Sequence, residues 1–216
     1  MTTWTNKELK DLRNNPNDYP TDDMLVSLAS AKLHPSATPS WEDGYDWGIG
    51  GGVEFPVLSF SEGNAVYFAL ETSHTMKIND WLDIHVHGTL PTNDAGKKVK
   101  WQVDVIAAGI GEAWSVPEGS PYTHEFTLKG AEADRHNMLD LADIPPMNST
   151  VSTIYQFKLT RIAPTSDPYG EDIYLIFADC HYRADSSGSY FEGAKLTEEY
   201  AKQKGTPKNP FKPGAW

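Results

Sequence analysis

The most regular pattern in the chain is an alternation of apolar and polar residues between positions 81 and 90. Its apolar positions are Leu82, Ile84, Val86 and Leu90. The polar positions include His85 and His87, with Asp83 beside them. Successive side chains of a strand point to opposite faces, so this period predicts a half-buried β-strand whose two histidines face away from the core.

Similar patterns predict further strands along most of the chain after position 52. They cover residues 53–60, 65–71, 98–108, 123–129, 151–162 and 172–183. The segment 132–148 fits either a helical turn or an irregular strand. Short strands about ten residues apart, without long helices between them, predict an all-β fold, which is a jelly-roll-like antiparallel β-sandwich.

The last predicted strand is apolar on both faces at its start, which is typical of a strand covered on both sides. Simple alternation places Asp179 and His181 on one face of it. Leu175 and Phe177 belong to the same face by this count. We therefore expect the strand to end at an edge of the sandwich or at a subunit interface.

Both ends of the chain are polar and rich in turn-forming residues. They predict an N-terminal arm over residues 1–52, a sandwich over 53–190 and a C-terminal tail over 191–216. Short helices are possible at 5–15 and 196–204. Because these extensions have so little hydrophobic periodicity, we expect them either to be mobile or to lie on neighbouring subunits, rather than to fold against their own core.

Composition narrows the classes of partner. The chain has 216 residues, and 18 basic against 30 acidic residues give a net charge of -12, which argues against a nucleic-acid-binding surface. No stretch approaches the ~18 apolar residues of a membrane span, and the start lacks a signal-peptide pattern. We therefore expect no nucleic-acid or membrane partner, and we expect synthesis in a cytoplasm.

The single cysteine, Cys180, lies in an apolar run and is expected to be a small buried side chain.

Histidines two residues apart on a strand can present two nitrogens to one metal ion, although solvated histidines show the same spacing. A mixed site of Asp83, His85, His87 and His181 would require their strands to be neighbours. A cupin would need a glutamate three or four positions after the second histidine, where Leu90 or Pro91 stands. No hydrolase elbow, phosphate loop or zinc-protease motif is present, so the sequence favours a protein that is not an enzyme.

Three segments together resemble a family of mostly uncharacterised virion structural proteins of tailed bacteriophages. They are the strand Asp83-Ile84-His85-Val86-His87, the strand around Trp101 and the segment from Asp179 to Ser189, and the resemblance spans about residues 45–190. In that family an aromatic residue usually follows the second histidine, whereas Gly88 stands there in this chain. The resemblance implies a structural role in the particle, on the capsid, the collar or the tail.

The His85-Val86-His87 triplet is also similar to motifs in trimeric phage spikes and fibres. In those proteins three copies meet at a threefold axis, where six imidazoles can hold one metal ion, commonly iron. This similarity implies a homotrimer with His85 and His87 as ligands of a divalent metal such as iron.

The expected function is therefore that of a non-enzymatic virion component, assembled as a homotrimer with other phage structural proteins in the host cytoplasm. The alternative is a carbohydrate-binding jelly-roll module or a receptor-binding protein, because sandwiches of this size bind glycans through exposed aromatic residues. The candidate aromatic residues are Trp41, Tyr45, Trp47, Trp81 and Trp114.

Overall fold

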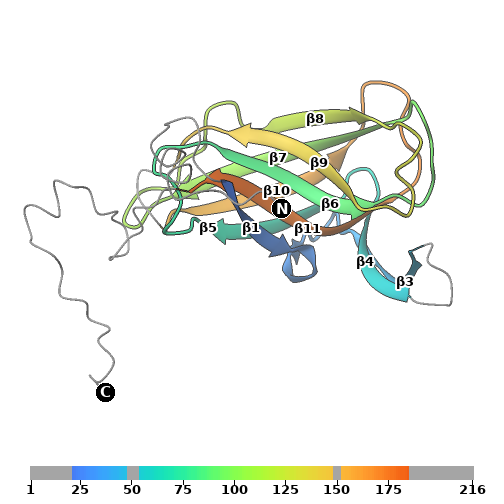
Figure 1. Cartoon of the computed structure of the whole chain (residues 1–216), viewed down its shortest axis with the longest axis horizontal. Helices are drawn as coiled ribbons and strands as arrows, with labels where there is room; N and C mark the ends of the chain where they lie inside the picture. The colour runs from blue at the N-terminus through green and yellow to red at the C-terminus, as the bar shows by residue number, and fades with distance from the viewer. Residues whose placement is uncertain (1–20, 48–53, 148–151, 185–216) are drawn as a thin grey trace, which may run out of the picture.

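Eight strands form two antiparallel sheets, and every connection between consecutive strands except that from β7 to β8 crosses from one sheet to the other (Figure 1). The computed structural model describes residues 21–47, 54–147 and 152–184. In the first sheet the order is β4-β11-β6-β9, with bounds Glu54–Phe60, Ile173–Arg183, Leu82–Thr89 and Asn137–Ile144. In the second sheet the order is β5-β10-β7-β8, with bounds Ala65–Glu71, Ile154–Ile162, Lys98–Ala108 and Tyr122–Thr127. This alternation is the order of a jelly roll, so the predicted fold class is confirmed.

Three more strands precede these eight, where the sequence predicted an arm. They are β1 (Thr21–Ser27), which pairs with β11, β2 (Lys32–Leu33), which pairs with β5, and β3 (Ser40–Asp46), which pairs with β4. A short 3-10 helix, Leu28–Ser30, joins β1 to β2 and buries Leu28 in the core. The prediction of an arm apart from the sandwich therefore needs correction here, because edge strands pair through their backbones and need little apolar periodicity.

The remaining terminal predictions concern other parts of the chain. The possible helices at 5–15 and 196–204, and the boundary at 190, lie outside the described residues. Within the parts of the chain that the structure describes, no helix is long and apolar enough to cross a membrane.

The core lies between the two sheets and is formed by the alternating apolar positions. β7 buries every second residue, as its sequence predicted, and Trp101 at its centre is fully buried. The indole of Trp101 meets the ring of Phe60 from β4 edge-on, with ring centroids 5.5 Å apart. Leu82, Ile84 and Val86 of β6 are also fully buried. Burial of these faces supplies the main stabilisation of the sandwich.

β6 differs from the prediction because both of its faces are buried. It runs between β11 and β9, and Figure 1 shows β6 and β9 side by side in one layer. The ambiguous segment at 132–148 contains β9, which pairs with β6 through a bulge between Ile84 and His85. A central strand receives side chains from both neighbours, and these cover the histidine face that we expected to be half-exposed.

β11 also contains a bulge, opposite the end of β6. The register with β6 shifts between Leu175 and Phe177. Leu175 is buried in the core, as are Ala178 and Cys180, whereas Asp179 lies on the outer face with His85. The prediction that Leu175 shares a face with Asp179 is therefore wrong, because the extra residue of a bulge reverses the alternation. Cys180 is fully buried, as predicted, and burial raises the pKa of its thiol.

Candidate functional site

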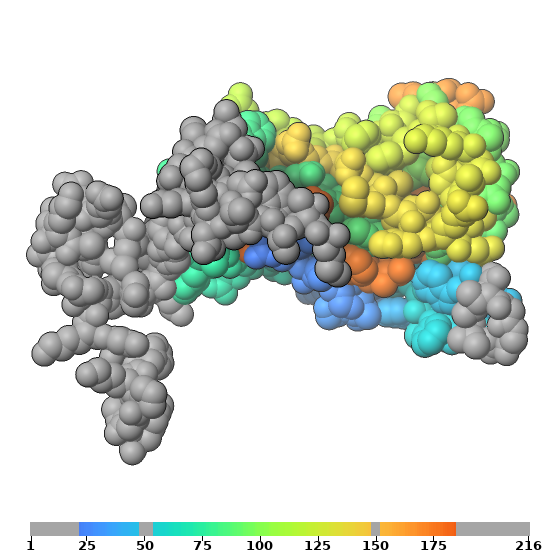
Figure 2. Space-filling model, in the orientation of Figure 1, coloured from blue at the N-terminus to red at the C-terminus, as the bar shows by residue number. Residues whose placement is uncertain are grey.

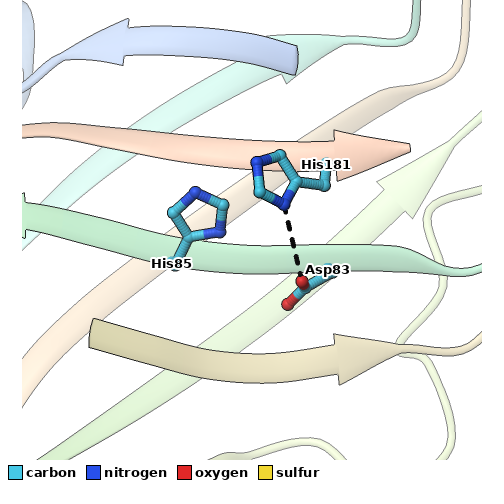
Figure 3. Close-up of side chains that lie close together, drawn as sticks. All are labelled: Asp83, His85 and His181. Atoms are coloured by element: carbon cyan, nitrogen blue, oxygen red, sulfur yellow. Dashed lines mark ion pairs between the residues drawn. The ribbon is translucent and has the colours of Figure 1, made fainter. Parts of the chain in front are cut away.

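The antiparallel pairing of β6 with β11 brings polar side chains from distant parts of the sequence together. His85 is directly opposite Asp179, and Asp83 is opposite His181. Figure 3 shows Asp83 and His85 on one strand and His181 on its neighbour, with the two imidazoles on the same side of the sheet. The rings of His85 and His181 are 4.2 Å apart between centroids. The mixed site suggested by the sequence required the strands of these residues to be neighbours, and β6 and β11 are paired.

One carboxylate oxygen lies at the centre of this group. Asp179 Oδ2 is 3.1 Å from His85 Nε2 and 3.6 Å from His87 Nε2. His181 Nε2 is 3.9 Å from the same oxygen. Three imidazole nitrogens therefore converge on one oxygen atom, and we refer to His85, His87, His181 and Asp179 as the histidine cluster.

The inner part of the histidine cluster is removed from solvent. His85 is fully buried, Asp179 is 4% exposed and His87 is 8% exposed. Three of their polar atoms are buried without a hydrogen-bond partner, namely Nδ1 of His85, Nε2 of His87 and Oδ1 of Asp179. Buried polar atoms without partners are rare in folded proteins and cost about 1–3 kcal/mol each. The arrangement therefore calls for a physical explanation.

His87 is held in place from its other side. Its Nδ1 lies 2.7 Å from Nε2 of His136, and its ring stacks on Phe177 with centroids 4.3 Å apart. Burial lowers the pKa of His87, and His85 and His136 lower it further, while Asp179 acts in the opposite direction. The net direction favours the neutral imidazole, which is the form that coordinates metals.

The outer part of the cluster contacts acidic side chains. His181 Nε2 lies 3.0 Å from Asp23 Oδ1 of β1, and His181 Nδ1 lies 3.7 Å from Asp83 Oδ2. Burial raises the pKa of Asp83, and nearby Asp143 acts in the same direction. His181 and these two carboxylates are partly exposed, so they form the solvent side of the cluster.

Sequence reasoning identified part of this arrangement. It named His85 and His87 as ligands and weighed His181 and Asp83 with them. It missed Asp179 as a partner, although Asp179 and His181 show the same spacing of two residues as the predicted pair. It also missed His136, which no local pattern marks. Whether three copies of His85 and His87 also meet at a threefold axis remains a prediction.

The aromatic residues proposed for glycan binding do not form one platform. Tyr45 is buried, and its hydroxyl donates to Asp134 Oδ1 at 2.5 Å. Trp41 and Trp47 line a hollow of about 390 Å³ with Phe55 and Ile176. Trp81 and Trp114 are not among the residues that line it, and they are 52% and 51% exposed.

A larger groove of about 710 Å³ lies against β5, β7 and β10 of the second sheet. Tyr67 lines it, and its ring stacks on His34 with centroids 5.6 Å apart. The groove also presents polar side chains, namely Lys32, Asp104, Gln156 and Lys158. The ring of Tyr67 beside several polar groups is the kind of lining that small polar ligands use.

No family model and no curated protein matches the chain. Solved structures are similar at the level of the β-sandwich. One is a cycloisomaltooligosaccharide glucanotransferase from Paenibacillus sp. (13% identity, TM-score 0.41, 77% of this chain and 18% of that one). Another is the insecticidal delta-endotoxin Cry8Ea1 from Bacillus thuringiensis (12% identity, TM-score 0.43, 76% of this chain and 24% of that one). A third is the xylan-binding domain from CBM 22 (13% identity, TM-score 0.32, 74% of this chain and 90% of that one). The chain spans less than a quarter of the first two proteins, and these likenesses concern the fold alone.

Proposed function

We propose that this chain is a non-enzymatic structural component of a tailed-bacteriophage virion. It assembles as a homotrimer with other phage structural proteins in the host cytoplasm. The observation that carries this proposal is an apolar hollow at one end of the sandwich, formed by β3, β4 and β11. The cyan surface of this end is visible in Figure 2, at the lower right of the molecule.

The hollow exposes several large hydrophobic side chains together. Phe55 is 56% exposed, Trp41 is 43% exposed and Ile176 is 37% exposed. The other lining residues are Ala29, Trp47, Pro56, Val57, Leu58 and Leu175, none of which is charged. Grouped exposed aromatic residues with few polar groups among them are typical of a surface that another protein covers.

The position of β3 supports self-association at the same place. Within the described residues, β3 is one of the two outer strands in the order of the first sheet, and β9 is the other. An outer strand has a row of unpaired backbone groups, which can pair with another chain beside the apolar hollow. The occupant that we propose is a neighbouring copy of this chain.

Light scattering on the full chain at micromolar concentration tests this proposal. We expect a trimer, and we expect Phe55→Asp to weaken it by at least tenfold in the association constant, because a charge enters the apolar contact. Trp114→Ala is the matched control, since Trp114 is a similarly exposed aromatic residue in the connection between β7 and β8. A wild-type chain that is monomeric at this concentration would exclude the proposed assembly.

A carbohydrate-binding role is the second candidate, and the groove against β5, β7 and β10 favours it. Tyr67 offers a ring face for a sugar, and Gln156 and Asp104 offer hydrogen-bonding groups beside it. Calorimetry with a panel of neutral oligosaccharides tests this role. Binding to a monomeric chain that is lost in Tyr67→Ala would favour the carbohydrate-binding role over the virion role.

A further inference from the structure

The histidine cluster has a geometry that its hydrogen bonds do not explain. A buried ion pair of His85 with Asp179 does not require Nε2 of His87 to face the same oxygen as well, at 3.6 Å, which is longer than a hydrogen bond. The ion pair also leaves Oδ1 of Asp179 and Nδ1 of His85 without partners. A group bound between these side chains would account for the convergence.

The distances fit ligands that surround one ion. In a tetrahedral zinc site with bonds of about 2.1 Å, neighbouring ligand atoms lie about 3.4 Å apart. The observed separations from Asp179 Oδ2 are 3.1 Å to His85 Nε2 and 3.6 Å to His87 Nε2. His181 Nε2 lies 3.9 Å from the same oxygen, and it completes the set of four ligands when it exchanges its contact with Asp23 Oδ1 for the metal.

The contact between His87 and His136 allows the tautomer of His87 that a metal requires. When Nδ1 of His87 carries the proton, it donates to Nε2 of His136 at 2.7 Å. Nε2 of His87 is then left with a free lone pair directed toward Asp179. A second hydrogen bond of this kind accompanies most metal-binding histidines, because it orients the ring and raises its basicity.

We propose that each chain binds one divalent transition-metal ion between β6 and β11, through His85, His87 and Asp179, with His181 as the fourth ligand. Imidazole with a carboxylate suits Zn²⁺ and Fe²⁺, and the burial of three ligands fits a structural ion that ties the two strands together. This site lies within one chain and does not require a threefold axis. It also does not depend on the proposed virion role.

Metal content and stability of the full chain test the site. Protein stripped with a chelator is titrated with Zn²⁺, bound metal is measured by elemental analysis, and the melting temperature is followed. We expect one ion per chain and a melting temperature that rises with Zn²⁺, because binding to the folded state alone stabilises it. The variants Asp179→Asn and His87→Ala are expected to lose the ion.

Two further variants test whether a loss of metal is specific to the histidine cluster. His124→Ala changes a histidine on β8 in the other sheet and is expected to bind as the wild type does. His136→Ala removes the supporting hydrogen bond and is expected to weaken binding by about tenfold. Asp179→Asn keeps the side-chain volume, and circular dichroism is used to check that this variant is folded.

The number of ions bound per chain and the metal content of the variants distinguish a site within one chain from a site at a threefold axis. One ion per three chains, retained in Asp179→Asn, would place the metal at a threefold axis and overturn the site within one chain. Zn²⁺ binding that is equal in the wild type and in the folded His87→Ala and Asp179→Asn variants would also overturn it, as would the absence of bound Zn²⁺ at a concentration of 1 mM.

Discussion

The packing of β11 against β6 determines which residue can stand at position 88. A Cβ atom built at Gly88 would lie 2.2 Å from the carbonyl oxygen of Tyr174 and 2.9 Å from a methyl carbon of Leu175. The close approach occurs where β11 bulges against the end of β6. The family that the sequence resembles usually carries an aromatic residue at this position. In this chain the backbone of β11 fills that space, so no side chain fits.

We therefore expect Gly88→Ala to destabilise the protein by about 1–3 kcal/mol, the usual cost of overpacking a dense interior. Gly170→Ala is a matched control, because a Cβ at Gly170 meets no atom within 4 Å. Urea unfolding followed by tryptophan fluorescence measures both variants. Equal midpoints for the two variants would show that the close contact at Gly88 does not exist in solution.

Glu125 provides a prediction about acid stability. Its carboxylate accepts hydrogen bonds from the backbone amide of Thr165 at 2.7 Å and from the Thr165 hydroxyl, and it pairs with Lys98 at 3.0 Å. These contacts lower the pKa of Glu125 to about 2, from a usual value of 4.5. A lowered carboxyl pKa stabilises the folded state above the unfolded-state value, and this contribution is lost as the pH falls from 4.5 toward 2.

Glu125→Gln should therefore lower the urea midpoint relative to the wild type at pH 6, and the difference should shrink at pH 2. Glu71→Gln, at an exposed position of β5, serves as the control. A difference between Glu125→Gln and the wild type that is the same at both pH values would contradict the assigned role of the carboxylate.

At the scale of elements, the segment before β4 belongs to the sandwich. Leu28 is fully buried between the sheets, whereas Leu25 on the outer side of β1 is 65% exposed. We expect Leu28→Ala to destabilise the protein by about 2–5 kcal/mol and Leu25→Ala by less than about 0.5 kcal/mol. Chemical denaturation measures the two values. Equal small effects would mean that this segment is a separate arm, as the sequence alone predicted.

The sequence predicted the strands that bury an apolar face. It did not predict the features that depend on how strands pair with one another. β5 and β7 have the predicted bounds, because β5 is a short, nearly continuous apolar run and β7 alternates clearly from Val99 to Val105. β1 and β3 were missed, since edge pairing leaves a weak apolar signal. The bulge in β11 changed which residues share a face, and no local pattern announces a bulge.

Only the part of the candidate site that lies on a single strand could be predicted from the sequence. The spacing of His85 and His87 is a local feature, so the sequence identified both. The pairing of Asp179 with His85 depends on β11 lying between β4 and β6. His136 reaches His87 from the segment just before β9, which only the tertiary structure shows.

At the scale of the whole molecule, the sandwich has two surfaces with different chemistry. The hollow at β3 and β4 is apolar and is the contact that we propose for another copy of the chain, while the groove at β5, β7 and β10 is partly polar. If the hollow is the trimer contact, Trp41→Ala should also weaken the trimer, because it removes a 43% exposed indole from the contact. Sedimentation velocity measures the shift to smaller species, and a trimer that resists both Trp41→Ala and Phe55→Asp would rule out this contact.

The proposed virion role is tested most directly by a cryo-electron microscopy map of the particle to which the proposal assigns this chain. Our account predicts repeated density for this jelly roll on the capsid, the collar or the tail, with the hollow at β3 and β4 covered by a neighbouring copy. A well-resolved particle in which no density fits the sandwich would contradict the account.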